Sequence, residues 1–74
     1  MILLDLHLPE VNGDVILRQI RAEENLKHIP VVVVSADAMQ GQIDRLLREG
    51  ATEYVTKPIE VTRALDLFDH YLRP

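Results

Sequence analysis

The chain has 74 residues, a mass of 8.5 kDa and a formal net charge of −4 at pH 7, which together allow one small domain. Hydrophobic residues make up 47% and charged residues 27%, a balance typical of globular rather than disordered proteins. The negative charge argues against nucleic acid as a direct ligand, the lack of cysteine excludes disulfides and thiolate metal sites, and no apolar run approaches membrane-spanning length.

Three short segments have the composition of buried strands. Residues 2–8 are a nearly continuous apolar run, residues 31–34 are four consecutive valines, and residues 53–56 form a third run that ends at Lys57-Pro58. Continuous rather than alternating apolar residues are typical of strands covered on both faces. The β-branched valines make residues 31–34 the strongest strand prediction in the chain.

Three segments with helical periodicity separate or follow these strands, at residues 14–24, 38–49 and 60–72. Gly50 is expected just past the end of the second helix. In the first helix Arg18 and Arg21 are predicted to point outward. The apolar residues predicted to face the core are Val15, Ile16 and Ile20, then Met39, Ile43, Leu46 and Leu47. In the third helix Val61, Ala64, Leu65, Phe68 and Leu72 share one stripe.

The resulting order is β-α-β-α-β-α. Strands joined by helical crossovers must be parallel, the connections are right-handed, and a parallel sheet needs helices on both faces. The sequence therefore predicts an α/β fold with a three-layer arrangement around a parallel sheet.

Three chemically distinct side chains fall at the carboxyl ends of the predicted strands: Asp5, Ser35 and Lys57. Ligands of open parallel sheets bind at this edge. A carboxylate can attack phosphorus, an ammonium group can neutralise the transferring oxygens, and a hydroxyl can donate a hydrogen bond to one of them. The trio therefore favours phosphoryl transfer.

Each residue also has a purely structural interpretation. Asp5 alone is more typical of a turn at a strand end, Ser35 of a cap on the following helix, and Lys57 of a solvated lysine before proline. An aspartyl nucleophile of the haloacid-dehalogenase type is a rival, but it needs a second acid two residues later, where this chain has His7.

The ordered motifs resemble the receiver domain of two-component response regulators, which has a flavodoxin-like fold. They are the run Asp-Leu-His-Leu-Pro-Glu-Val-Asn-Gly at 5–13, Ser35-Ala36, Gly50-Ala51, and Tyr-Val-Thr-Lys-Pro at 54–58. The resemblance implies that Asp5 is the phosphoacceptor and that Lys57 pairs with it or with its phosphate. It also implies that the Ser35 hydroxyl shifts toward the phosphoryl group while Tyr54 changes rotamer, although Tyr54 could equally be a half-buried strand residue.

The resemblance assigns further roles around the site. The backbone carbonyl of His7 and the carboxylate of Asp5 would bind Mg²⁺, and the side chains of His7 and Asp37 would tune the lifetime of the phosphoryl group. The Lys57-Pro58 peptide bond is expected to be cis, as it often is in such domains.

The resemblance begins at the family's third strand, so residues 1–74 are interpreted as a truncated receiver domain whose first strand, first helix and second strand are missing. If the family's first helix is missing, Leu65, Phe68 and Leu72 are expected to lack part of their cover. The acidic pair that holds Mg²⁺ has no counterpart, because no carboxylate precedes Asp5. Since Mg²⁺ prefers six oxygen ligands, we expect weak metal binding and a doubtful phosphoacceptor activity.

The balance between apolar burial and the cost of ordering the chain predicts self-association. Apolar burial of about 115 kcal/mol nearly cancels an ordering cost of about 110 kcal/mol, so we expect a homo-oligomer joined through the edge from Ile2 to Leu8 or through the last helix. The family implies a cytoplasmic, non-enzymatic protein that, if full length, works with a sensor histidine kinase or a phosphotransfer protein. The alternatives are a dimerising interaction module that works without phosphorylation, and an excised or designed receiver fragment.

Overall fold

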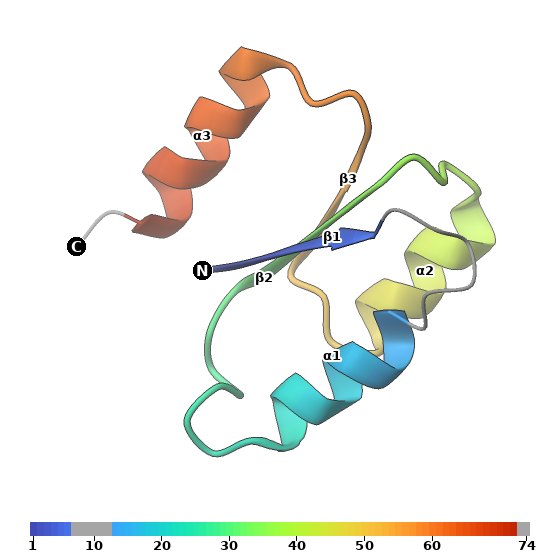
Figure 1. Cartoon of the computed structure of the whole chain (residues 1–74), viewed down its shortest axis with the longest axis vertical. Coiled ribbons are helices and arrows are strands. Elements are labelled where there is room, and N and C mark those ends of the chain that lie inside the picture. The colour runs from blue at the N-terminus through green and yellow to red at the C-terminus, as the bar shows by residue number, and fades with distance from the viewer. Residues whose placement is uncertain (7–12, 73–74) are drawn as a thin grey trace.

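The computed structural model describes residues 1–6 and 13–72, in which strands and helices alternate strictly (Figure 1). This confirms the predicted order of elements and the α/β class. The elements are β1 (Ile2–Leu6), α1 (Gly13–Ala22), β2 (Val31–Ser35), α2 (Gln40–Arg48), β3 (Glu53–Thr56) and α3 (Val61–Leu72).

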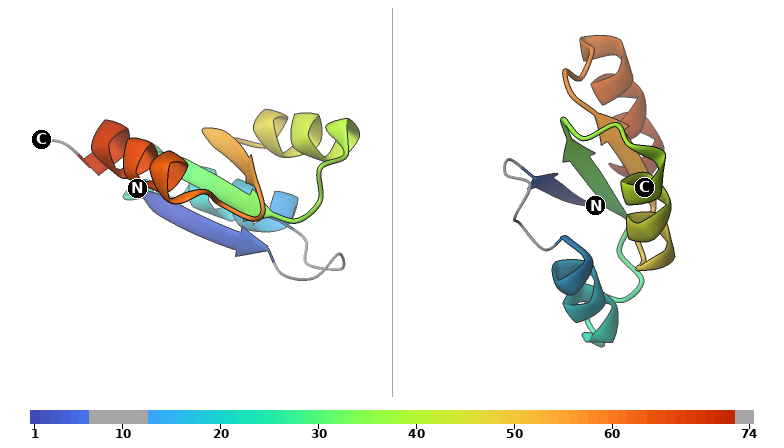
Figure 2. Two further views of the ribbon diagram at one scale, coloured as in Figure 1. Left: turned by 90° about the horizontal axis from the view of Figure 1, so that it is seen from above. Right: turned by 90° about the vertical axis from the view of Figure 1, so that its right-hand side faces the viewer.

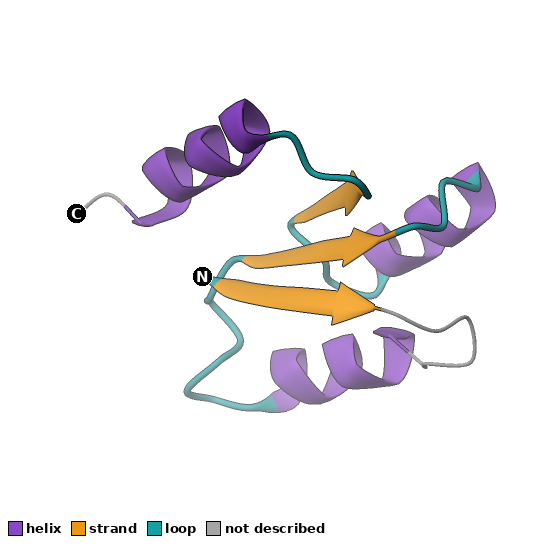
Figure 3. Cartoon of the chain, turned by 45° about the horizontal axis from the view of Figure 1, so that its top comes forward, coloured by secondary structure: helices purple, strands orange, loops and turns teal. Residues whose placement is uncertain are grey.

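The sheet has the order β1-β2-β3, and both pairings are parallel, as the arrows in Figure 3 show. All five residues of β2 are buried, which explains why four consecutive valines are tolerated there: both faces of this strand are covered. The register places Asp5 opposite Val34 and Ser35 opposite Thr56, so the three strands end at the same edge.

Helices cover both faces of the sheet. On one face Leu17 of α1 and Leu46 of α2 form a buried cluster with Val31 and Val33. On the other face Leu67 of α3 packs on Val32, Val34 and Val55. Figure 2 shows α3 and α1 on opposite sides of the strands, which confirms the three-layer arrangement.

The predicted core faces of the helices are partly wrong. Leu17 and Leu67 are buried although the periodicity did not single them out. The predicted core residues found exposed instead are Val15, Met39 and Leu47. Leu65, Phe68 and Leu72 are exposed as expected, and so is Val61 of the same stripe. A small three-stranded sheet covers only a narrow strip of each helix, so an apolar stripe does not by itself identify the buried face.

Arg21 was predicted to point outward, and this is wrong. Its guanidinium group donates hydrogen bonds to the backbone oxygens of Gly50 (2.6 and 2.9 Å), Ile29 (2.7 Å) and Lys27 (3.1 Å). A single side chain therefore ties the end of α1 to the two loops that lead into β2 and β3.

Gly50 ends α2, as the sequence predicts. The N–H of Ala51 donates to the carbonyl of Leu46 and the N–H of Gly50 to that of Leu47, the paired bonds of a Schellman motif. Gly50 has φ +121°, a conformation that L side chains rarely adopt. A Cβ at this position would lie 2.7 Å from Cγ of Arg21.

We expect Gly50→Ala to destabilise the fold by about 1–3 kcal/mol, because it strains the backbone and displaces the Arg21 side chain. The matched control is Gly41→Ala in α2, where a Cβ would meet nothing within 4 Å and helix propensity should improve. Urea denaturation midpoints measure both changes. Equal midpoints for the two variants would contradict this role of Gly50.

Polar contacts to Glu53 of β3 hold α3 in place. One carboxylate oxygen accepts a hydrogen bond from the Tyr71 hydroxyl, and the other accepts one from Arg63 at 2.7 Å. The Tyr71 hydrogen bond and then the Arg63 guanidinium lower the pKa of Glu53 below its ordinary 4.5, although burial opposes the shift. The same hydrogen bond raises the pKa of Tyr71 above 10.0.

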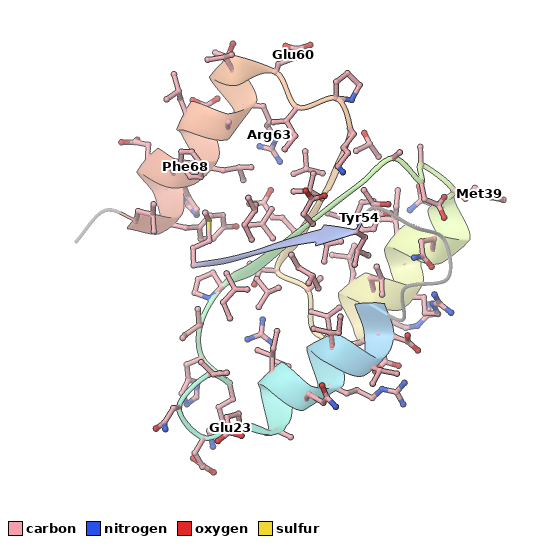
Figure 4. The ribbon with its side chains drawn as sticks, viewed as in Figure 1. Glu23, Met39, Tyr54, Glu60, Arg63 and Phe68 are labelled. Carbon is pink, nitrogen blue, oxygen red and sulfur yellow. The ribbon has the colours of Figure 1, made fainter. Side chains whose placement is uncertain are left out.

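A lowered pKa in the folded state means that Glu53 stabilises the fold fully above about pH 4.5 and that this contribution is lost as the pH falls through the folded-state value. We expect Glu53→Gln to lose about 1 kcal/mol of unfolding free energy at pH 7 and to flatten the decline below pH 4.5. Glu23→Gln is the control, because it makes the same substitution at an exposed residue after α1, which Figure 4 labels. Parallel acid-stability curves for wild type and Glu53→Gln would refute this linkage.

The accessible surface of the chain is 5092 Å², larger than the roughly 4,700 Å² that size scaling gives for a compact protein of this mass. Large apolar side chains that remain exposed include Leu3 of β1 and Val61, Leu65, Phe68 and Leu72 of α3. Within the described ranges, none of the helices has the length and apolar character needed to span a bilayer.

Candidate functional site

The site forms where the three parallel strands end. β1 contributes Asp5 in its fourth position, β2 contributes Ser35 as its last residue, and Lys57 directly follows β3. The N–H of Lys57 donates to the carbonyl of Ser35 (2.8 Å), which fixes the start of the loop after β3 against the end of β2.

Asp5 and Lys57 are in direct contact. The distance from Lys57 Nζ to Asp5 Oδ1 is 2.6 Å, and their side chains are 30% and 44% exposed for lysine and aspartate. Exposed ion pairs of this kind contribute little to stability, about 0–1 kcal/mol. The pair therefore adds little to the stability of the fold, and its charged groups remain accessible to a ligand from solvent.

An open groove of about 600 Å³ lies beside this ion pair. Its lining is otherwise apolar, and the sequence analysis did not anticipate it. The lining residues are Leu3, Asp5, Val34, Ala36, Lys57, Pro58 and Ile59. The Lys57-Pro58 peptide bond is cis, as the resemblance implied. Alternation along β1 is the sequence signal that could have revealed the groove, because it places Leu3 and Asp5 on one face.

Ser35 is buried, and its hydroxyl oxygen accepts a hydrogen bond from the N–H of Asp37 (3.1 Å). The structural alternative, that Ser35 caps the following helix, is wrong: α2 begins at Gln40, and Met39 precedes it without a side-chain cap. The Asp37 carboxylate instead accepts a hydrogen bond from the N–H of Met39 (2.9 Å) and shapes the segment that leads into α2.

Tyr54 is half-buried in β3 and packs against the cluster under α1 and α2. Its hydroxyl donates to the carbonyl of Asp37 (2.7 Å). Figure 4 shows Tyr54 at the same end of the sheet as Met39. The carbonyl of Asp37 thus accepts a hydrogen bond from Tyr54, and its N–H donates one to Ser35. One residue of the backbone therefore connects the two side chains.

The described residues do not by themselves fit a magnesium site. None of their His, Asp and Glu side chains gather in groups of three or more, and Asp5 is the one carboxylate that lines the groove. His7, the other residue to which the resemblance assigned metal binding, lies outside the described residues.

Chemically, the arrangement offers a carboxylate oxygen that is open to solvent and in contact with an ammonium group. Such a carboxylate can act as a nucleophile toward an electrophile that carries negative charge, because the ammonium group offsets the repulsion. A phosphoryl group is an electrophile of this kind.

The sequence matches a known family of proteins. The family model described as "Response regulator receiver domain" matches residues 1–69. The polar-differentiation response regulator DivK of Brucella ovis is 40% identical over 72 residues, which are 97% of this chain and 58% of that protein. The chain thus spans little more than half the length of the curated relatives that it matches.

Solved structures give the same result. A response regulator receiver domain from Rhodospirillum rubrum superposes with a TM-score of 0.75 at 32% identity, covering 99% of this chain and 56% of that one. The receiver domain of a sensor histidine kinase from Pseudomonas aeruginosa has a TM-score of 0.77 at 30% identity, covering 95% of this chain and 57% of its own. That receiver carries a magnesium ion coordinated in its active-site cleft.

Proposed function

Because the chain belongs to the receiver-domain family of response regulators, we propose that it takes part in phosphorelay signal transduction and that Asp5 accepts the phosphoryl group. The contact between Lys57 Nζ and Asp5 Oδ1 at 2.6 Å is the observation that carries this proposal. It places a cation at the atom where the negatively charged phosphoryl group would arrive.

In the proposed step a carboxylate oxygen of Asp5 attacks the phosphorus of a phosphorylated donor. A new oxygen–phosphorus bond forms, and the bond from phosphorus to the donor breaks, so that the donor leaves with its electron pair. The product is an acyl phosphate on Asp5. The ammonium group of Lys57 neutralises charge on the phosphoryl oxygens during transfer and afterwards.

The contacts of Asp37 support a switch that involves Ser35 and Tyr54. If the Ser35 hydroxyl turned toward a phosphoryl group on Asp5, the N–H of Asp37 would lose its acceptor. The segment that this hydrogen bond holds also carries the carbonyl that accepts from Tyr54. We therefore propose that phosphorylation is read out as a change at Tyr54.

Any magnesium binding by this chain is proposed to be weak, with Asp5 and the backbone carbonyl of His7 as ligands, because the described residues supply a single carboxylate at the groove. We also propose that the side chains of His7 and Asp37 modulate how long the acyl phosphate persists. Asp37 supports this because it lies in the segment next to Ser35.

The proposed partner is a sensor histidine kinase or a phosphotransfer protein, acting in the cytoplasm. We propose that the chain is a phosphoacceptor rather than an enzyme with its own substrate turnover. Its net charge of −4 is the reason for proposing no nucleic acid as a partner. The lack of an apolar run of membrane-spanning length is the reason for proposing no membrane.

Incubation with acetyl phosphate and Mg²⁺, followed by intact mass spectrometry, tests the phosphoacceptor. We expect a mass gain of one phosphoryl group in the wild type and none in Asp5→Asn. Asp66→Asn, which removes an exposed carboxylate from α3, should gain the same mass as the wild type. No gain in the wild type, or a gain that survives in Asp5→Asn, would refute the assignment.

A second candidate function is a dimerising interaction module that works without phosphate. The apolar residues that remain exposed on β1 and α3 favour it, since such surfaces mark interfaces. β1 is an edge strand of the described sheet, and its sequence carries one charge, that of Asp5. We propose that the isolated chain self-associates through Ile2 to Leu8 or through α3. The same surfaces would be exposed if the chain is an excised or designed fragment of a receiver domain.

Sedimentation velocity of the isolated chain tests self-association. At micromolar concentration we expect a species heavier than the monomer, because burial of the exposed apolar surface adds stability that the monomer lacks. A folded monomer, identified by its sedimentation coefficient together with the circular dichroism of an α/β protein, would overturn the self-association proposal.

A further inference from the structure

The contact between Lys57 and Asp5 brings an amine close to a carboxyl carbon as well as to a carboxylate oxygen. Lys57 Nζ lies 2.6 Å from Asp5 Oδ1, and a carbon–oxygen bond is about 1.2 Å long, so Nζ lies no more than about 4 Å from Cγ of Asp5. Groups positioned to react with each other are about 3–3.5 Å apart. The flexible four-carbon stem of the lysine allows the small shift that this requires.

The sheet holds the two residues in place for such a reaction. The register puts Asp5 of β1 opposite Val34, and the N–H of Lys57 donates to the carbonyl of Ser35 (2.8 Å), so both residues are anchored to β2. Well-oriented groups on one molecule react as if at an effective concentration of about 10⁵ M or more. That value exceeds the concentration of liquid water, which is the competing nucleophile for any activated carboxyl group at this position.

Activation of Asp5 is the condition for the reaction, and the inference therefore rests on the proposed phosphoacceptor function. A carboxylate beside an ammonium group forms an ion pair and no amide, because the carboxylate carbon is a poor electrophile. An acyl phosphate on Asp5 has a good leaving group on the same carbon, and Lys57 is then the amine in contact with the site.

We propose that the phosphorylated chain has a second fate besides hydrolysis: Lys57 attacks the acyl phosphate and forms an isopeptide bond with Asp5. The ammonium group first gives one proton to a phosphoryl oxygen. The freed electron pair on Nζ forms a bond to Cγ of Asp5, and the bond from Cγ to the bridging oxygen breaks. Phosphate leaves with that electron pair and takes a second proton, while the amide nitrogen keeps the third. The products are one amide and one dihydrogen phosphate ion.

The other nucleophiles of the chain are placed less well. Lys27 is the only other lysine in the sequence, and its ammonium group pairs with Glu24 in the loop after α1, 3.0 Å from Oε2. Ser35 ends the neighbouring strand, but its hydroxyl oxygen accepts a hydrogen bond from the N–H of Asp37 (3.1 Å). An amine is also a stronger nucleophile than a hydroxyl group toward an acyl carbon.

The isopeptide bond would end the phosphoacceptor activity of the chain. It consumes the carboxylate that accepts the phosphoryl group and the cation that stabilises it, and it replaces both charges with a neutral amide. It also joins the end of β1 covalently to the residue after β3, across β2. Repeated phosphorylation would therefore convert the chain irreversibly into a linked form.

Intact mass spectrometry over time tests this second fate. The chain is incubated with acetyl phosphate and Mg²⁺, the donor is removed by buffer exchange, and the phosphorylated species is followed as it decays. We expect two products, one at the starting mass from hydrolysis and one lighter than the starting mass by one water. The lighter product should account for about a tenth or more of the phosphorylated chains.

Tryptic digestion and tandem mass spectrometry then locate the bond. We expect the peptides 1–18 and 49–63 to be joined through Asp5 and Lys57. Lys27→Arg, which removes the other lysine, should give the same yield of linked chain as the wild type.

The outcomes separate this inference from the phosphoacceptor assignment. A phosphoryl gain that decays entirely to the starting mass would overturn the isopeptide bond alone. A loss of water confined to the unlinked peptide 1–18 would do the same, because it indicates cyclisation at Asp5 without Lys57. Neither a phosphoryl gain nor a loss of water would overturn the proposed function together with this inference.

Discussion

The parallel pairing of β1 and β3 with a fully buried β2 is the constraint on which the rest of the structure depends. Four consecutive valines leave β2 no polar face to present to solvent, so helices must cover both sides of it. The helices that cover it are crossover connections between successive strands, which therefore run parallel. Parallel strands then end together, which brings Asp5, Ser35 and Lys57 to one edge of the sheet.

The contacts of the site depend on how the three strands end at that edge. The lysine and the aspartate come from the two outer strands and meet across the end of the middle one, so their contact depends on the register of both pairings. Ser35 and Tyr54 are joined through the two ends of one residue, Asp37. The same small sheet leaves Leu3 of β1 and one side of α3 exposed, and Leu3 lines the groove beside the site.

The sequence predicted the order of the elements, the parallel sheet, the residues at the strand ends and the glycine that ends α2, because each depends on local pattern or on topology alone. It failed on Arg21 and on the buried faces of the helices. Whether Leu17 or Val15 faces the sheet depends on where α1 lies over it, and an apolar stripe as regular as that of α3 looks the same whether buried or exposed. The shorter hydrogen bonds of Arg21 all go to backbone carbonyls, which leave no trace in the sequence.

Zero-length carbodiimide cross-linking tests the central claim most directly, because it joins a carboxylate to an amine only when the two are in contact. We expect an isopeptide bond between Asp5 and Lys57 in the digested chain, identified by tandem mass spectrometry. The pair Lys27 and Glu24, whose Nζ and Oε2 atoms lie 3.0 Å apart, serves as the internal control for reaction. A cross-link in the control pair without one between Asp5 and Lys57 would contradict the convergence of the strand ends.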